Sequence, residues 1–204
     1  YDTTLRDGTQ GENITFTADE KLKIALRLDE MGIHYIEGGW PGSNPRDIRF
    51  FDLAKRERFT NARITAFGST RKPDIEAADD ANLQAILRTE TPSAAIFGKS
   101  WPLHVETIMD NTLAENLAMI TDSVVFLKSH GREVIYDAEH FFDGFKDDPG
   151  YAVETLAAAF DAGADYVVLC DTNGGTLPHE VESITQAVNE KITKRFGAAG
   201  NSLN

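Results

Sequence analysis

The chain has 204 residues, of which 41% are hydrophobic and 26% charged, a composition typical of one globular domain and unlike that of a disordered chain. Its 33 acidic residues outnumber the 20 basic ones, and a net charge of −13 argues against a nucleic-acid or anionic-membrane partner, since either would need a basic surface. A single cysteine, Cys170, excludes an internal disulfide, no apolar run reaches the length of a membrane span, and no signal-peptide pattern opens the sequence, so we expect a cytoplasmic protein.

Short β-rich segments alternate with longer helical segments along most of the chain. The expected strands are residues 1–5, 33–37, 63–67, 94–97, 133–138 and 165–169. The expected helices are residues 18–31, 46–56, 73–83, 113–129, 150–162 and 178–194. Thr17 and Glu20 form a capping-box pattern at the start of the first helix, and Gly32 follows its end.

This alternation predicts a parallel sheet with helices outside it, either a closed barrel or an open doubly wound sheet. No G-x-G-x-x-G motif follows the first strand, which weakens the dinucleotide-binding version of the open sheet. A complete barrel takes about 250 residues. We therefore expect an α/β fold, a (β/α)8 TIM barrel, with residues 1–204 forming one incomplete catalytic domain of about six βα units plus a fragment of the seventh.

The last eight residues, GAAGNSLN (197–204), do not have the pattern of the seventh strand that is due there. We expect that residues are absent from the sequence near Gly197, and that the natural chain starts before Tyr1.

Polar and ionisable side chains follow all six expected strands, at the end of a barrel where catalytic residues gather. The segments are TLRDGTQ (4–10), EGG (37–39), GSTR (68–71), GKSW (98–101), DAEH (137–140) and CDTN (170–173). From the pattern alone, each has an alternative structural interpretation.

Arg6 beside Asp7 is either an anion-binding group next to a metal ligand or a surface ion pair. Glu139 and His140 are either an acid–base pair or two solvated side chains. The segment 171–173 either orients a substrate or forms an Asx-type turn.

Residues 2–10 (DTTLRDGTQ) resemble the opening signature of a family of metal-dependent barrel enzymes, which includes 2-isopropylmalate, homocitrate and citramalate synthases, with hydroxymethylglutaryl-CoA lyases more distant. Four further segments resemble the citramalate-synthase branch more than the leucine-pathway branch, and the resemblance extends to about residue 195. They are YIEGGWPGSNP (35–45), IFGKSW (96–101), YDAEHFFDG (136–144) and LCDTNGGTLP (169–178).

The resemblance implies an acyltransferase that condenses acetyl-CoA with a 2-oxo acid, with pyruvate as the acid and (R)-citramalate and CoA as products. It implies that Asp7 ligates a divalent metal ion (Mg, Mn or Zn), which polarises the keto group, and that Arg6 stabilises the oxygen that becomes an alkoxide. It places Thr172 at the carboxylate of the oxo acid, Glu139 near the reacting carbons and Gln10 in support of the site. A homodimer is also expected from the resemblance.

One departure leaves alternatives open. The family supplies two further metal ligands from an H-x-H motif, and none of the five histidines of this sequence stands in one. Synthesis of 2-isopropylmalate or homocitrate, carbon–carbon cleavage of the lyase type, and a non-catalytic interaction module therefore remain alternatives to citramalate synthesis.

Overall fold

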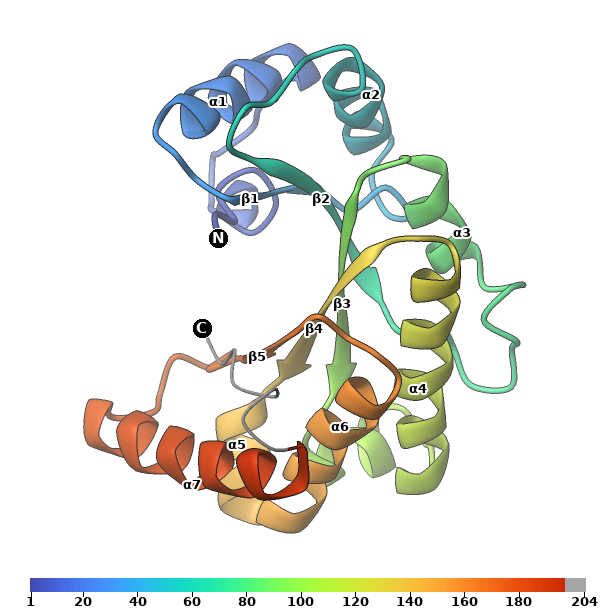
Figure 1. The fold of residues 1–204 in the computed structure, drawn as a ribbon, viewed down its shortest axis with the longest axis vertical. Coiled ribbons are helices and arrows are strands. Elements are labelled where there is room, and N and C mark those ends of the chain that lie inside the picture. Colours follow the sequence, from blue (N-terminus) through green and yellow to red (C-terminus); the bar gives the residue numbers. More distant parts are fainter. Residues whose placement is uncertain (197–204) are drawn as a thin grey trace.

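A single parallel sheet forms the centre of the computed structural model, which describes residues 1–196. Its strands are β1 (Tyr35–Gly39), β2 (Arg63–Ser69), β3 (Ser93–Lys99), β4 (Glu133–Glu139) and β5 (Tyr166–Leu169), paired in that order. Each strand pairs with the next along the chain after a helical crossover, and the sheet curves into an open arc with the helices on its outer side (Figure 1). The predicted α/β fold is confirmed as part of a TIM barrel. The expectation about residues near Gly197 lies outside the described residues.

The helices alternate with these strands as expected. They are α1 (Ala18–Glu30), α2 (Pro45–Ala54), α3 (Ala81–Arg88), α4 (Leu113–Ser129), α5 (Phe141–Asp147), α6 (Pro149–Asp161) and α7 (Pro178–Phe196). The predicted capping box is confirmed, because Thr17 accepts from the backbone of Glu20 and the Glu20 side chain accepts from the backbone of Thr17. Gly32 has φ +83°, which suits the left-handed residue that ends a helix.

The strand predicted at residues 1–5 is wrong, since Asp2 alone forms a parallel bridge, to Ile36. The Asp2 carboxylate accepts from the N–H of Thr4 at 3.0 Å, and the N–H of Gly8 donates to the carbonyl of Thr3 at 3.1 Å. The chain therefore turns at once into a short 3₁₀ helix (Gly8–Gln10). The consequence is that the segment with Arg6 and Asp7 is a turn packed beside β1.

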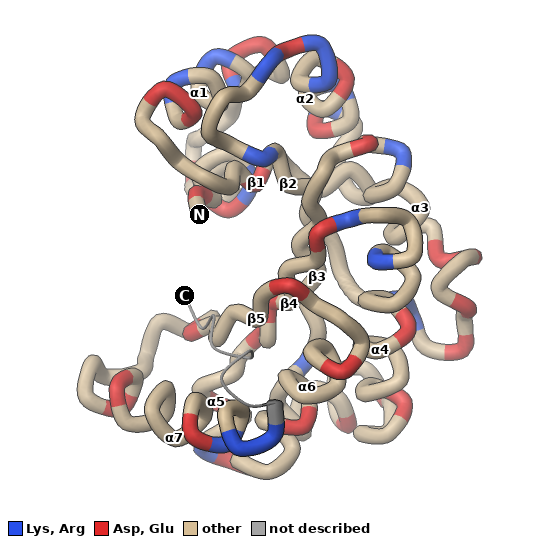
Figure 2. The backbone as a smooth tube through the Cα atoms, in the orientation of Figure 1, with Lys and Arg blue, Asp and Glu red and all other residues tan. Residues whose placement is uncertain are grey.

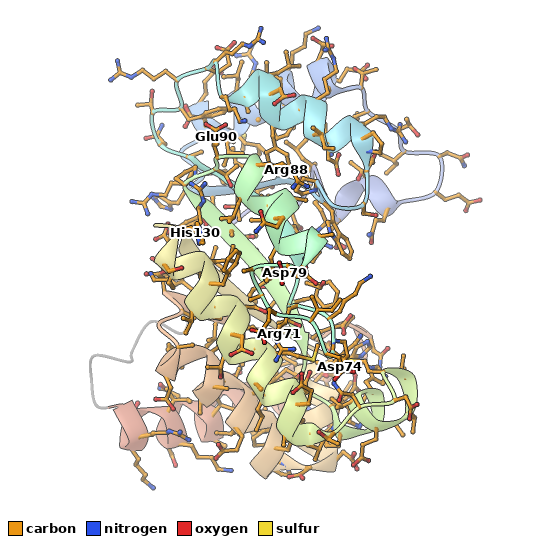
Figure 3. The ribbon with its side chains drawn as sticks, turned by 90° about the vertical axis from the view of Figure 1, so that its right-hand side faces the viewer. Arg71, Asp74, Asp79, Arg88, Glu90 and His130 are labelled. Atoms are coloured by element: carbon orange, nitrogen blue, oxygen red, sulfur yellow. The ribbon has the colours of Figure 1, made fainter. Side chains whose placement is uncertain are left out.

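The start of the third predicted helix is also wrong, because α3 begins at Ala81 rather than near residue 73. Asp80 is its N-cap and accepts from two backbone N–H groups of the first turn. The preceding loop is held by Arg71, a buried side chain that forms ion pairs with Glu115 (2.8 Å) and Asp122 (2.7 Å) of α4 and lies against that helix (Figure 3).

Apolar side chains form two clusters, one on each side of the sheet. The larger lies between sheet and helices, and Ile36, Ile96 and Tyr136 are fully buried in it. The smaller lies on the inner side and is built on Phe67 and Ile135. Charged residues are concentrated on the helices and loops (Figure 2). No helix within residues 1–196 is long and apolar enough to cross a membrane.

Candidate active site at the carboxyl ends of the strands

Arg6 is the most firmly held of the predicted site residues. Its Nε donates to the carboxylate of Glu37, a fully buried side chain in the middle of β1, and its Nη1 donates to Asp7 at 2.9 Å. The guanidinium carbon lies 3.8 Å from the centre of the Phe67 ring, a cation–π geometry. Arg6 therefore has a fixed position, and among the described residues no hydrogen bond uses its Nη2.

Glu37 and Asp137 are two carboxyl groups on the inner side of the sheet, the first in the middle of β1 and the second toward the carboxyl end of β4. Burial raises the pKa of Glu37, although the Arg6 guanidinium and a 2.6 Å hydrogen bond from Tyr1 oppose the rise. Burial and then the charge of Glu37 raise the pKa of Asp137 to about 7. Asp137 is thus a carboxyl group that gains and loses its proton near neutral pH.

A cavity of about 780 Å³ runs along the inner side of the sheet. At the carboxyl ends of the strands it is lined by Arg6, Asp137 and Cys170. Burial is the main cause that raises the pKa of the Cys170 thiol, and the charges of Asp137 and Glu139 add to it. Cys170 lies next to the end of β5, half-buried beside this cavity.

Glu139 is held by the end of the neighbouring strand. It is opposite Lys99 in the register of β3 and β4, and the Lys99 ammonium donates to its carboxylate. The backbone carbonyl of Glu139 also accepts from the hydroxyl of Ser100 at 2.7 Å. The side chains of Glu139 and His140 have different partners, because the imidazole of His140 lies 3.1 Å from Asp143, while Glu139 accepts from Lys99.

Thr172 lies in the loop after β5, and its hydroxyl oxygen accepts from the backbone N–H of His140 at 2.9 Å. Its neighbour Asn173 donates to Asp143 at 2.8 Å. Asp171 does not form an Asx turn, because its carboxylate accepts from the backbone N–H and the hydroxyl of Thr176 rather than from the residue two positions on. The N–H of Gly174 donates to the backbone carbonyl of Asp171 at 2.9 Å and closes a turn. The turn leaves Thr172 exposed and linked to the end of β4.

Asp7 and Gln10 lie at the rim and are both exposed. The Asp7 side chain is 59% exposed and bonds to Arg6. Within residues 1–196, no three His, Cys, Asp or Glu side chains are grouped so that they could hold a metal ion. The described residues therefore supply one anionic donor at this place and do not form a metal centre by themselves.

Sequence reasoning did not single out Lys99 or Asp137. Both stood in the strand-end segments, but their importance depends on cross-strand register and burial, which no local pattern reports. Lys99 had one available signal, since it is a lysine that directly follows an apolar strand.

Residues 1–199 match the HMGL-like family. The chain belongs to this family. Among its relatives is the (R)-citramalate synthase of Aquifex aeolicus, which is 56% identical over 192 residues that cover 94% of this chain and 36% of that protein. A 2-isopropylmalate synthase of Staphylococcus carnosus is 32% identical over 194 residues, which cover 94% of this chain and 36% of that protein.

A solved HMGL-like barrel has the same fold. The hydroxymethylglutaryl-CoA lyase of Pseudomonas aeruginosa superposes with a TM-score of 0.73 at 18% identity, covering 95% of this chain and 64% of that one. At this identity the likeness shows the fold alone. The chain spans about a third of the length of the synthases it matches.

Proposed function

We propose that this chain is the catalytic barrel of an acyltransferase that condenses acetyl-CoA with pyruvate to give (R)-citramalate and CoA. The observation that carries the proposal is the placement of Arg6, a cation fixed by Glu37, Asp7 and Phe67 beside the cavity that runs along the inner side of the sheet. A preorganised donor of this kind is the device that stabilises negative charge as it develops on a substrate oxygen.

In the condensation, the enolate of acetyl-CoA attacks the keto carbon of the oxo acid, and the keto oxygen becomes an alkoxide. Arg6 has Nη2 available to donate to that oxygen, because its Nε and Nη1 bond to Glu37 and Asp7. Thr172 donates to the carboxylate of the oxo acid, and Glu139 lies near the reacting carbons, with its charge balanced by Lys99. Gln10 supports the rim of the site. Hydrolysis of the thioester then releases CoA.

Pyruvate is favoured over a larger oxo acid because the chain is 56% identical to a citramalate synthase and 32% identical to a 2-isopropylmalate synthase. The lyase alternative has no comparable support, since the relation to the lyase is one of fold.

The family's synthases depend on a divalent metal and use acetyl-CoA. We propose Asp7 as one ligand of a Mg, Mn or Zn ion, whose other ligands would come from outside residues 1–196. We also propose that residues 1–204 belong to one catalytic domain and that the protein is a homodimer.

The proposal is tested by CoA release from acetyl-CoA by the full natural chain, with a divalent metal and pyruvate, 2-oxoisovalerate or 2-oxoglutarate. Release with a clear preference for pyruvate is the expected result. Preference for a larger acid would keep the mechanism and change the substrate. Absence of release with all three, in protein shown to carry a metal ion, would refute the proposal.

A further inference from the structure

His140 has a left-handed backbone conformation, φ +55°, at the point where β4 ends and α5 begins. This conformation is uncommon for a residue that has a β-carbon, and it persists where the surroundings fix it. Residues held in this way are often part of a functional site, so the contacts of His140 are informative.

The left-handed turn aims two successive backbone donors at the loop after β5. The N–H of His140 donates to the hydroxyl oxygen of Thr172 at 2.9 Å, and the N–H of Phe141 donates to the carbonyl of Cys170 at 3.0 Å. With φ below zero, the peptide plane before Phe141 would rotate, and both bonds could not be kept together.

The imidazole strengthens the same connection. Its Nδ1 lies 3.1 Å from Asp143 Oδ2, and that oxygen also accepts from the side chain of Asn173 at 2.8 Å. On its other side, the ring of His104 packs against it with 4.6 Å between ring centres. The ring of His140 is therefore fixed, and it ties α5 to the residue after Thr172.

The backbone bond decides what the Thr172 hydroxyl can do. A hydroxyl has one donor and two acceptor positions. Because the oxygen of Thr172 accepts from His140, its O–H is directed away from that N–H, and within residues 1–196 it has no acceptor, so it is available to donate to a substrate.

We propose that His140 is a positioning residue that, through its left-handed backbone, orients the hydroxyl of Thr172 to donate to the carboxylate of the oxo acid. This inference rests on the proposed function and adds to it the residue that sets the affinity for the oxo acid through Thr172. It predicts that the backbone conformation of His140 matters more than its imidazole.

Two variants separate backbone from ring. His140→Asn loses the imidazole but tolerates a positive φ, whereas His140→Val is a β-branched residue that does not. The KM for pyruvate is expected to rise about 5- to 10-fold in His140→Val, the value of one hydrogen bond, and to stay within about 2-fold in His140→Asn, with kcat changed less in both. His140→Ala replaces the valine variant if the latter does not fold.

Glu90 provides the matched control, because it also has a positive φ (+57°), is exposed, and precedes β3 at the opposite end of the sheet (Figure 3). Glu90→Val is expected to lower the thermal midpoint in the same way as His140→Val and to leave the KM unchanged. A KM that rises equally in both valine variants would mean that strain alone is responsible, and would overturn the proposal.

A double-mutant cycle with Thr172→Val tests the route of the effect. In that background, His140→Val is expected to raise the KM less than 2-fold. A rise as large as in the unaltered protein would overturn the proposal, and so would an equal rise in His140→Asn and His140→Val.

Failure of the proposed activity and failure of the positioning role of His140 give different results. If the protein turns over another oxo acid, the proposed substrate fails and the same cycle is measured with that acid. If it turns over none, the cycle is measured as pyruvate affinity by calorimetry. Retained coupling would then support the positioning role without the proposed activity, and loss of pyruvate binding would overturn both.

Discussion

Lys21 and Asp47 form a buried ion pair between α1 and α2, and replacing one member has a large predicted cost. Both residues are 4% exposed; the Lys21 ammonium lies 2.5 Å from Asp47 and 3.1 Å from the carbonyl of Gly38. The other carboxylate oxygen of Asp47 accepts from the N–H of Trp40 at 2.8 Å. Lys21→Met removes the cation and leaves a buried carboxylate with one backbone donor. Breaking such a pair costs about 3–5 kcal/mol, which is the loss expected in the free energy of unfolding.

The measurement is urea unfolding of the parent and Lys21→Met, followed by circular dichroism. Lys55→Met is the matched control, because its ion pair with Glu90 is exposed and worth about 0–1 kcal/mol. The variant Lys21→Met/Asp47→Asn is expected to recover part of the loss, since the asparagine oxygen still accepts from Trp40 without carrying a charge. A loss in Lys21→Met no larger than in Lys55→Met would refute the argument that burial makes this pair costly to break.

Three further predictions concern the site. Asp137 has a pKa of about 7 in the folded protein against 3.8 for the free group, so as the pH rises from about 4 to 7 the unfolded chain loses this proton first, and the free energy of unfolding falls by on the order of 4 kcal/mol. The thermal midpoint of Asp137→Asn should therefore depend less on pH over this range than that of the parent protein. An equal pH dependence in both would contradict the raised pKa. Arg6→Lys keeps the positive charge but loses the planar guanidinium whose Nε donates to Glu37, so kcat should fall about 100-fold while the fold is unchanged. A near-normal kcat would exclude Arg6 as the donor to the alkoxide. Gly144→Ala would place a β-carbon 2.4 Å from the carbonyl oxygen of Ser100, so unfolding in urea should show a loss of about 1–3 kcal/mol, and an unchanged midpoint would show that this contact can relax.

The elements that the sequence predicted well are those with local signals. The capping box at Thr17 and the glycine at position 32 each act on their own turn, so their effect is readable from neighbouring residues. The helix α5 was missed because it is short and begins at the left-handed His140, which no residue-type rule anticipates.

The site residues, too, could be predicted only where the signal was local in the sequence. The polar strand ends located Glu139 correctly at the carboxyl end of β4, whereas Arg6 lies in a turn beside β1 and not at the end of a strand. Their partners Glu37 and Lys99 lie on neighbouring elements, and the burial of Glu37 depends on packing across the sheet. Such pairings depend on the register between neighbouring strands and on the curvature of the sheet, which are properties of the whole fold.

The buried pairs Lys21–Asp47 and Arg6–Glu37 illustrate why a barrel retains charges that apolar residues of similar size could replace at little cost in stability. The first links α1 and α2 to the end of β1, where Lys21 also donates to the carbonyl of Gly38, and the second links β1 to the turn that contains Arg6. The first fixes the loop at Trp40, whose ring packs edge-on against Phe67, and the face of Phe67 in turn supports Arg6. Apolar substitutes would fill the volume without fixing a direction. In the proposed reaction the Nη2 of Arg6 must point at one substrate oxygen, and the two ion pairs fix the direction of the guanidinium that this requires.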